Sequence, residues 1–358
     1  MFIDFPYRLH RDDPLWAPPL RRDVATLLSP DRNPFFEHAE ASYFLAARNG
    51  EVVGRIAAIR NDAHGRAHAE ERQVGFFGLF ETVDEQAVAD VLFGAAAAWL
   101  RERGFTVMRG PMNFSTNDEC GLLVDGFDTP PVVLMPHNPA YYPPLVERAG
   151  FVKAMDLLAY EGAREPVPAR LVKAAARLAQ RYHITLRGLD VRHFWTDVAL
   201  VKRLYNEAWE NNWGFIPMTD AEMNHLARRL KPLVVPDLVV FASIDERPVG
   251  FAIALPDFNV ALRTNRSGRL FPFGLFRVLW NQRRITRSRV ITLGVVPACR
   301  RSGVDALMYA WLWRHGRARG ITWSESSWIL ESNAPMRNAL ERMGFAVYKT
   351  YRVYDRPT

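Results

Sequence analysis

Two stretches of the chain alternate apolar runs with a short polar turn, in the pattern of a β-hairpin. Residues 43–59 read YFLAARNGEVVGRIAAI, and residues 239–255 read VVFASIDERPVGFAIAL. Each stretch predicts two strands joined by a tight turn, at Arg48-Asn49-Gly50 and at Asp245-Glu246-Arg247. Because the same order of apolar run, turn, Val-Gly pair and apolar run occurs twice, the pattern indicates an internal repeat.

A helix tail that leads into a strand also occurs twice. Residues 145–161 and 340–355 each end an amphipathic helix at a glycine, Gly150 or Gly344, and continue with Phe and an apolar strand. A weaker match relates residues 95–110 to residues 309–326, where an apolar helix closes in Arg and Gly. Three matches in one order predict a tandem duplication, with insertions in surface loops.

The second copy shows the expected elements most clearly. The pattern predicts a strand, two helices, the hairpin, a strand, a helix, a strand, a helix and a strand, at residues 184–189, 194–212, 219–230, 239–255, 290–296, 302–320, 321–329, 334–343 and 346–354. We therefore expect two α+β domains, residues 1–164 and 165–358, joined by a linker at 165–168. Each domain is expected to hold a mixed, mostly antiparallel sheet flanked by helices.

Composition agrees with two globular domains. The chain has 358 residues, 49% hydrophobic and 24% charged, which is long enough for two cores. No apolar run reaches the roughly 18 residues of a membrane-spanning helix. Two cysteines, Cys120 and Cys299, imply no disulfide framework. Since residues 1–13 lack the pattern of a signal peptide, we expect a cytoplasmic protein.

Positive charge is concentrated in one part of the second copy. The net charge is +7, and ten arginines but no acidic residue lie between Asp257 and Asp305. Residues 263–289 also contain Phe271, Phe273, Phe276 and Trp280. Such a segment can form a substrate lid or the contact of a homodimer, which we favour, or else bind an anionic membrane surface or a nucleic acid.

The run that follows this segment carries the clearest motif. Residues 293–306 read LGVVPACRRSGVDA, in which a strand ends near Val-x-Pro and an Arg-x-x-Gly loop opens a helix. Farther on, Asn333 opens a helix that ends in Gly344-Phe345. This loop and the order of the elements resemble the GNAT acyltransferase superfamily, in its tandem two-domain form. The resemblance covers most of residues 185–354 and, more loosely, residues 39–160.

The resemblance implies a site for acetyl-CoA or another acyl-CoA. Backbone N–H groups at a helix N-terminus bind anions, and a glycine lets a diphosphate approach. The site residues that it implies are Leu293, Gly294, Val295, Val296, Arg300, Arg301, Ser302, Gly303, Val304, Asp305 and Asn333. The alternative interpretation of this loop is an ordinary helix N-terminus that Ser302 caps.

Two positions depart from the family pattern. Asp305 stands where a small residue is usual, so its carboxylate would repel a diphosphate. Leu340 stands where many members have a tyrosine that protonates the leaving thiolate. Candidate substitutes are Tyr348 and Tyr351, with Glu325 or Glu331 as a weak general base. The alternative is that these tyrosines are ordinary strand aromatics and these carboxylates are solvated.

The first copy lacks the phosphate loop, because its equivalent residues 78–90 are acidic and contain no arginine. It has instead a polar insertion at residues 110–138. We interpret this insertion as an acceptor-binding loop that faces the second copy. Its candidate substrate-binding residues are Asn113, Asn117, Asp118 and Glu119, with Tyr141 or Tyr142 closing the pocket. The alternative is a structural loop whose polar side chains satisfy its own turns.

These observations favour an acyl-CoA-dependent N-acyltransferase that acts on a small-molecule or peptide amine. One alternative is a non-catalytic protein that binds an acyl-CoA or another anionic ligand. A second alternative is an aminoacyl transferase of the Fem type, which would use charged tRNA. We expect no metal site, because His64 and His68 have a suitable spacing but no evident third ligand.

Overall fold

A computed structural model describes residues 1–162, 168–210, 212–300 and 302–358. The expected linker at 165–168 lies almost wholly outside these residues, so the domain boundary at 164 stays a prediction. The first half contains α1 (Phe5–Leu9), α2 (Arg21–Leu27), β1 (Ala39–Arg48), β2 (Glu51–Asn61), α3 (Asp62–Ala67), β3 (Val74–Thr82), α4 (Gln86–Arg101), β4 (Val107–Gly110), β5 (Leu122–Asp125), α5 (Tyr142–Arg148) and β6 (Val152–Gly162).

The second half repeats this order with different insertions. It contains α6 (Ala169–Arg181), β7 (Ile184–Gly188), α7 (Phe194–Trp209), α8 (Asp220–Leu230), β8 (Val239–Ile244), β9 (Arg247–Pro256), α9 (Asn259–Leu262), α10 (Gly274–Asn281), β10 (Arg287–Val295), α11 (Val304–Ala318), β11 (Trp323–Leu330), α12 (Ala334–Arg342) and β12 (Ala346–Pro357). In each half a hairpin, a strand, a helix, a strand, a helix and a strand follow one another, which confirms the predicted α+β tandem architecture.

Both predicted hairpins form, and their turns show why those residues are there. Asn49 and Gly50 have φ angles of 51° and 82° in the turn between β1 and β2. Asp245 and Glu246 have φ angles of 45° and 65° in the turn between β8 and β9. Two consecutive residues with positive φ match the right-handed twist of the strands, and Asn, Asp and Gly adopt that conformation most readily.

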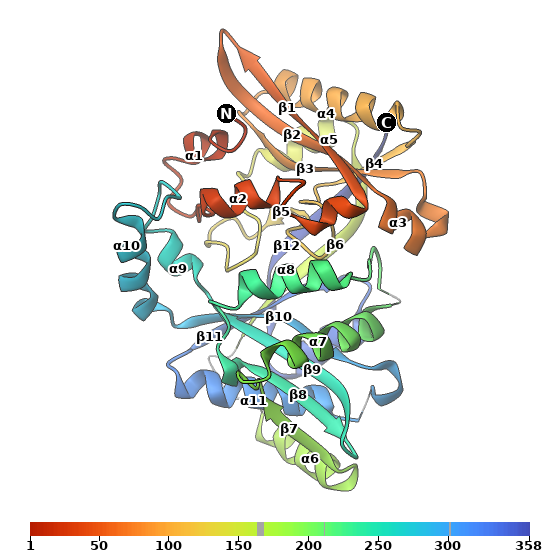
Figure 1. Ribbon diagram of the computed structural model, residues 1–358, viewed down its shortest axis with the longest axis vertical. Coiled ribbons are helices and arrows are strands. Elements are labelled where there is room, and N and C mark those ends of the chain that lie inside the picture. Colours follow the sequence, from red (N-terminus) through yellow and green to blue (C-terminus); the bar gives the residue numbers. More distant parts are fainter. Residues whose placement is uncertain (163–167, 211, 301) are drawn as a thin grey trace.

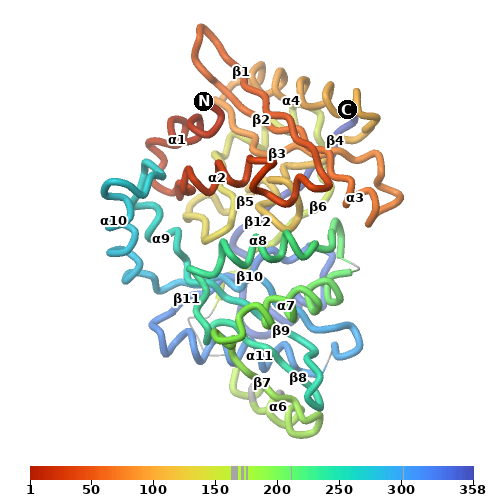
Figure 2. The backbone as a smooth tube through the Cα atoms, viewed as in Figure 1, coloured from red at the N-terminus to blue at the C-terminus, as the bar shows by residue number. Residues whose placement is uncertain are grey.

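The strands form one continuous sheet across the whole molecule. Their order is β1-β2-β3-β4-β12-β6-β11-β10-β9-β8-β7, and β5 also pairs with β12. The last strand of each half has therefore changed places: β12 pairs with β4 of the first half, and β6 pairs with β11 of the second. Figure 1 shows the first half above the second, and in Figure 2 the C-terminal strand runs up into the first half.

The cores follow this exchange of strands. One apolar cluster includes Phe241, Phe251 and Met308 of the second half, together with Tyr160 of β6. Another joins residues of both halves, including Phe76 of β3 and Tyr351 of β12. Because each half buries a strand of the other, the two halves share one folded unit. Among the described residues, none of the helices is both long and apolar enough to cross a membrane.

Candidate functional site

A cavity of about 2250 Å³ lies between the two halves and is lined by residues of both. Its walls come from residues 111–122 and 131–138 of the first half, and from α7, α8, β10 and β11 of the second. Pockets for drug-sized ligands usually measure roughly 300–1,000 Å³. This cavity is therefore large enough for a much longer ligand.

Strands β10 and β11 separate inside this cavity. They pair in parallel from Arg287 and Trp323 to Val290 and Ser326, and the described pairing ends there. At the same level, the register between β10 and β9 shifts after Val290 and leaves Ile291 as a bulge. The result is an open V between two parallel strands, which a ligand can enter from the cavity.

The alternation of an antiparallel ladder fixes which backbone groups face the V. The Val296 N–H donates to the Val249 carbonyl (2.9 Å), so Gly294 and Thr292 also point their polar groups toward β9. Leu293 and Val295 then point theirs toward β11. Because β11 has already diverged, these N–H and C=O groups are open to a ligand that lies in the V.

The helix that follows, α11, begins at a glycine as the motif predicts. Gly303 is its N-cap residue with a φ of 82°, and no side chain caps the first turn. The Ser302 hydroxyl donates to the Cys299 carbonyl (2.7 Å), so the alternative in which Ser302 is the cap is wrong. The first N–H groups of α11 are therefore available to an anion. Asp305 lies in that first turn.

Arg300 connects the loop to helix α7. Its guanidinium donates to the Ala208 carbonyl (2.8 Å) and lines the cavity. A Cβ at Gly294 would lie 2.2 Å from the ring of Trp209, one residue farther along α7, so this position requires glycine. Arg301 lies outside the described residues.

Most of the predicted cofactor residues line one cavity. They are Leu293, Gly294, Val295, Arg300, Gly303, Val304, Asp305 and Asn333, whereas Val296 and Ser302 are not part of the lining. Asn333 opens α12 as predicted, and its side chain accepts a hydrogen bond from the Met336 N–H (3.2 Å). Its amide oxygen is therefore already engaged in capping.

The polar insertion of the first half reaches the same cavity and contacts the second half. Asn117 accepts a hydrogen bond from the Tyr205 hydroxyl (2.7 Å) and donates to the Ile216 carbonyl (3.1 Å). Asn113 accepts from the Leu79 N–H (2.8 Å). Both amides thus bind other groups of the protein. Asn113 and Asn117 therefore fit the alternative in which the insertion is a structural loop.

Asp118 and Glu119 differ from these amides, because their carboxylates face the cavity with few partners. Asp118 lies 3.9 Å from Arg229 of α8. Burial raises the pKa of Asp118 to about 6, although Arg229 opposes the shift. Burial also raises the pKa of Glu119, whose carboxylate accepts a hydrogen bond from Asn113 (3.2 Å). The cavity therefore holds two partly buried carboxylates whose pKa values lie above the usual range.

Sequence reasoning missed the residues of α7 and α8 at this site. Tyr205 and Trp209 stack with ring centroids 4.8 Å apart, and both line the cavity. His225 and Arg229 line it from α8, and burial lowers the pKa of His225. On an amphipathic helix these residues look like ordinary surface or core positions, because no motif connects them to the loop before α11.

The first half has no open V. The Met112 N–H donates to the Phe77 carbonyl (2.7 Å), and the Asn113 side chain binds the Leu79 N–H of β3 (2.8 Å). A Cβ at Gly78 would lie 2.0 Å from the Met112 carbonyl oxygen. The chain itself thus fills the space between β3 and β4. A ligand therefore has no open space between β3 and β4 like that between β10 and β11.

The predicted catalytic residues Glu325, Tyr348 and Tyr351 are not among the lining residues of the cavity. Tyr348 donates to the Glu325 carboxylate, and Tyr351 is fully buried in the shared core. The prediction assumed that β12 completes the sheet of the second half. Because β12 pairs instead with β4 and β6, its tyrosines lie outside the V.

The prediction that Tyr141 or Tyr142 closes the pocket is wrong as well. The Tyr141 hydroxyl donates to the Thr82 carbonyl (2.8 Å), and the Tyr142 hydroxyl donates to the Glu81 carboxylate (2.7 Å). Both side chains therefore hold α5 against the end of β3, in the interior of the first half, and neither lines the cavity.

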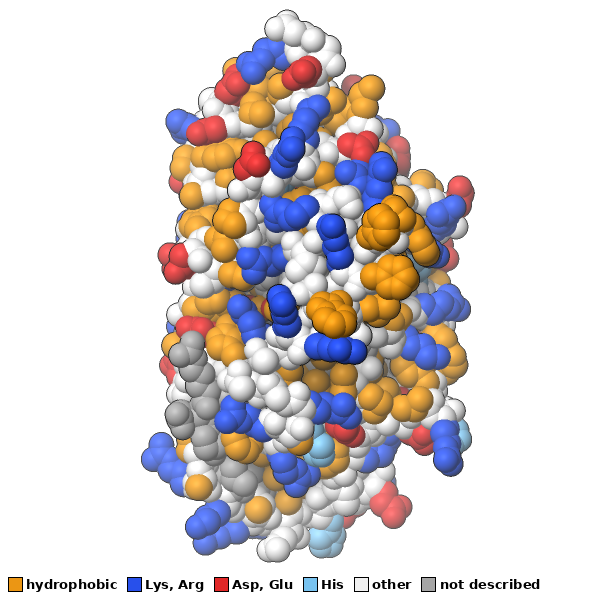
Figure 3. Space-filling view, turned by 90° about the vertical axis from the view of Figure 1, so that its left-hand side faces the viewer, with side chains coloured by type: hydrophobic (Ala, Val, Ile, Leu, Met, Phe, Trp, Pro, Cys, Tyr) orange, Lys and Arg blue, Asp and Glu red, His pale blue; other side chains and the backbone are white. Residues whose placement is uncertain are grey.

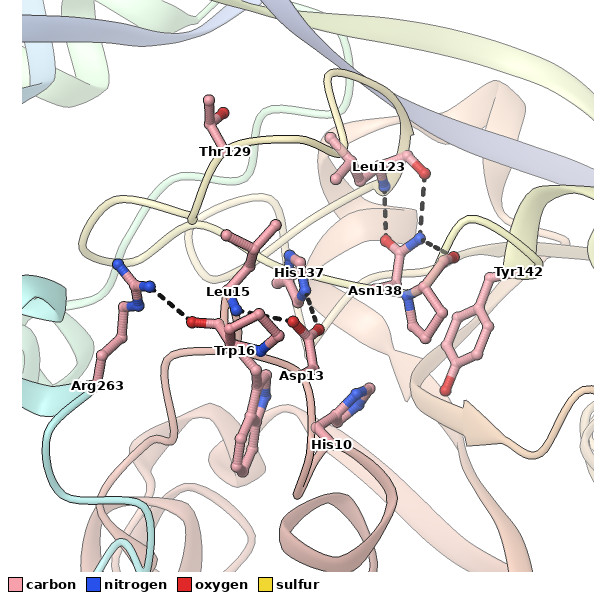
Figure 4. A network of polar contacts seen from close by, with 12 residues as sticks. His10, Asp13, Leu15, Trp16, Leu123, Thr129, His137, Asn138, Tyr142 and Arg263 are labelled. Carbon is pink, nitrogen blue, oxygen red and sulfur yellow. Dashed lines mark hydrogen bonds and ion pairs between the residues drawn. The ribbon is translucent and has the colours of Figure 1, made fainter.

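The N-terminal segment forms another wall of the cavity, with Pro6, Tyr7 and Trp16 among the lining residues. Figure 4 shows how it is held: Asp13 binds the His137 ring (2.7 Å), and Arg263 donates to the Pro14 carbonyl. Although burial opposes it, the hydrogen bonds from His137 and the Leu15 N–H lower the pKa of Asp13 to about 2.

The two histidines at metal-like spacing have other partners. His64 lies 3.0 Å from the Glu71 carboxylate, and the His68 ring contacts the Phe215 carbonyl (2.8 Å). Over the part of the chain that the structure describes, no group of three or more His, Cys, Asp or Glu side chains is placed to hold a metal ion.

Solved structures with a similar fold are GNAT proteins, one of them in tandem form. The tandem GNAT protein from the clavulanic acid biosynthesis pathway matches with a TM-score of 0.54 at 11% identity, over 99% of this chain and 93% of that one. A GCN5-related glucosamine N-acetyltransferase region of a fungal multi-domain GH3 β-N-acetylglucosaminidase matches with a TM-score of 0.59 at 14% identity, over 99% of this chain and 37% of that one. These matches confirm the GNAT fold.

Two relatives match in sequence along nearly the whole chain. Bacterial ceramide synthase of Caulobacter vibrioides (strain NA1000 / CB15N) is 39% identical over 361 residues, covering 99% of this chain and 94% of the relative. The chain belongs to its family. Protein YghO of Escherichia coli (strain K12) is 36% identical, covering 99% of this chain and 92% of the relative. No protein-family model matches the chain.

Proposed function

We propose that this member of the family is an N-acyltransferase that moves a long acyl chain from coenzyme A to the amino group of a sphingoid base. One observation carries the proposal: the open V of the second half and the carboxylates of the first half line a single large cavity. The printed name of the Caulobacter relative agrees with it, since a ceramide is an N-acylated sphingoid base.

The residues of the V and of α11 fit an acyl-CoA. The N–H groups of Val304 and Asp305 would bind the diphosphate at the positive end of the helix, beside the uncrowded Gly303. The open backbone groups of Leu293 and Val295 would bind the amides of the pantetheine arm, as a strand edge binds a peptide. When bound, acyl-CoA would supply the activated thioester carbonyl.

Asp118 and Glu119 are suited to the amine. A sphingoid base carries an ammonium group, and an ammonium group beside two partly buried carboxylates offsets the cost of ionising them. The amine must lose a proton before its nitrogen can attack a carbonyl. With a pKa of about 6, Asp118 is ionised near neutral pH and would accept that proton.

The remaining walls are suited to hydrocarbon chains. Leu226, Leu230 and Leu233 line the cavity from the α8 region, and Leu262 and Val278 line it from α9 and α10. An acetyl group would leave most of this apolar surface in contact with water. A long chain would bury it, with a gain of about 0.8 kcal/mol for each buried CH₂ group.

The test is a reaction of the full-length protein with palmitoyl-CoA and sphinganine, with mass spectrometry of the amide and a thiol assay for released coenzyme A. We expect N-acyl product, and much less of it with acetyl-CoA. The variant Gly303→Glu should lose both binding of coenzyme A and product. Gly303→Asn, which tolerates a positive φ without adding charge, controls for folding and should retain part of both.

Each alternative gives a different result. If calorimetry shows binding of palmitoyl-CoA but no amine gives a product, the protein binds a ligand without catalysing a reaction. Asp305 in the phosphate loop, and the fully buried Leu340 in place of a tyrosine, are the features that fit this outcome. Transfer from charged tRNA without use of acyl-CoA would identify a Fem-type reaction. Absence of acyl-CoA binding would overturn the proposal.

A further inference from the structure

The segment between β9 and β10 exposes a group of large apolar side chains. The exposed fractions are 76% for Phe271, 70% for Phe273, 70% for Phe276, 65% for Trp280 and 47% for Leu279. Figure 3 shows the face of the molecule on which α10 lies, where large hydrophobic side chains lie together among Lys and Arg. Contiguous exposed apolar groups of this kind mark an interaction surface. We call these five residues the aromatic patch.

The arginines of the segment divide into two sets. Arg263 and Arg266 point inward and bind backbone carbonyls of residues 10–16. The outer set is exposed, and no ion pair joins its members to an acidic side chain among the described residues: Arg269, Arg277, Arg283 and Arg284. The outer arginines and the aromatic patch together form a basic, apolar surface, and the segment that carries them contains no acidic residue.

This face borders the cavity. Leu270, Val278, Leu279 and Gln282 line the cavity from the inner side of the segment, while the aromatic patch lies on the outer side. Leu279 belongs to both, since it is half exposed and also lines the cavity. The cavity therefore reaches the surface of the molecule next to the aromatic patch.

We propose that this face docks on the surface of an anionic membrane and places the opening of the cavity against the lipid. Aromatic side chains partition to the boundary between headgroups and acyl chains. Arginines near an anionic surface are attracted to lipid phosphates, with a gain of roughly fivefold in affinity for each. The aromatic rings of the segment are exposed and do not line the cavity, so a role as a substrate lid leaves them without a function.

Charge distinguishes a membrane from a second copy of the chain as the occupant. A two-fold dimer through this face would bring the outer arginines of one copy against those of the other. No acidic residue lies between Asp257 and Asp305 to compensate them. An anionic bilayer supplies both the negative charge and the apolar layer that the aromatic patch lacks.

The experiment is co-sedimentation of the full-length protein with vesicles, which needs no knowledge of the reaction. We expect binding to vesicles of phosphatidylglycerol and phosphatidylethanolamine, little binding to phosphatidylcholine alone, and weakening by salt. The combined variant Phe273→Ala, Phe276→Ala, Trp280→Ala should bind at least tenfold more weakly. The variant Arg277→Gln, Arg283→Gln, Arg284→Gln should lose the preference for anionic lipid.

A matched control is available on α6, far from this face. Replacement of the exposed Arg170, Arg177 and Arg181 by Gln removes the same charge and should leave vesicle binding unchanged. Quenching of Trp280 fluorescence by brominated lipid, absent in Trp280→Phe, would show contact directly. Three results would overturn the proposal: no vesicle binding, binding that both triple variants retain, or variant-sensitive binding of single-stranded RNA or of a second copy in place of vesicles.

Discussion

Arg289 and Glu325 form an ion pair that is buried on both sides, with 3.8 Å between the guanidinium and the carboxylate. The pair lies at the closed end of the V, where β10 and β11 are still joined. Arg289 also donates to the carbonyls of Val133 (3.0 Å) and Leu134 (2.8 Å) in the first half. The Glu325 carboxylate is therefore the buried counter-ion of a cation that joins the two halves.

The first prediction concerns the loss of this carboxylate. We expect Glu325→Gln to lower the free energy of unfolding by about 3–5 kcal/mol, because it leaves the Arg289 charge buried without a counter-ion. Denaturant unfolding measures the change. The control is Glu85→Gln, which breaks an exposed pair with Arg48 and should have little effect. Equal stability of the two variants would show that other groups, and not Glu325, stabilise the charge of Arg289.

The second prediction uses the carboxylate in the phosphate loop. Asp305 lies in the first turn of α11, where it would repel a bound diphosphate. We expect Asp305→Asn to bind coenzyme A roughly two- to fivefold more tightly at low salt, with a smaller gain at high salt. Titration calorimetry measures it. Asp220→Asn, at the first turn of α8 away from the loop, should not change the affinity. Unchanged affinity for Asp305→Asn would place the diphosphate elsewhere.

The hairpins and the helix starts could be predicted because each depends on a few neighbouring residues. Positive φ angles in the hairpin turns favour Asn49, Gly50 and Asp245, and the loop before α11 favours Gly303, so the sequence shows these turns directly. Thr219 and Glu222 likewise mark the start of α8 by a capping box. The strand predicted to bind the cofactor and the polar insertion were placed from such local signals, and both line the cavity.

The partners of β6 and β12 could not be predicted. Both strands alternate in the same way, and nothing in that alternation says which sheet edge each will join. Placing Tyr348 and Tyr351 in the site depended on that choice, and so it failed. The division of the arginines in residues 263–284 into an inner and an outer set could not be predicted either, because the inner set is defined by contacts with residues 10–16, which are distant in the sequence.

The third prediction concerns pH and Asp118. Burial raises its pKa from 3.8 to about 6, so the folded protein holds this proton to a higher pH than the unfolded chain does. Ionisation of Asp118 therefore does not affect stability below about pH 4. Between about pH 4 and 6 it lowers the free energy of unfolding, and above about pH 6 the loss is constant. We expect Asp118→Asn to raise the free energy of unfolding at about pH 8 by roughly 1–3 kcal/mol, and to leave it unchanged near pH 4.

The same variant should lose activity while it gains stability. If Asp118 accepts the proton of the amine, the Asn variant should lower kcat by about 10²-fold or more. Unfolding curves across this pH range and rates at neutral pH check both effects. Asp125→Asn, at an exposed position at the end of β5, is the control and should change neither quantity. A variant that is less stable at pH 8 would contradict the assignment.

The last prediction separates the two sets of arginines. Arg266 donates to the carbonyls of Trp16 (2.9 Å), Arg11 (2.9 Å), His10 (3.1 Å) and Asp13 (2.6 Å), whereas the Arg269 side chain is exposed. We expect Arg266→Ala to speed hydrogen exchange in residues 1–20 and to lower the free energy of unfolding by roughly 1–3 kcal/mol.

Arg269→Ala should leave that exchange unchanged and weaken only the binding of anionic vesicles. Arg266→Lys should behave like Arg266→Ala, because one ammonium group cannot reproduce a planar fork of donors that reaches four carbonyls. Hydrogen exchange with mass spectrometry measures the N-terminal segment in all three variants. If Arg266→Ala left residues 1–20 as protected as in the natural protein, that wall of the cavity would be held by Asp13 and His137 rather than by the basic segment.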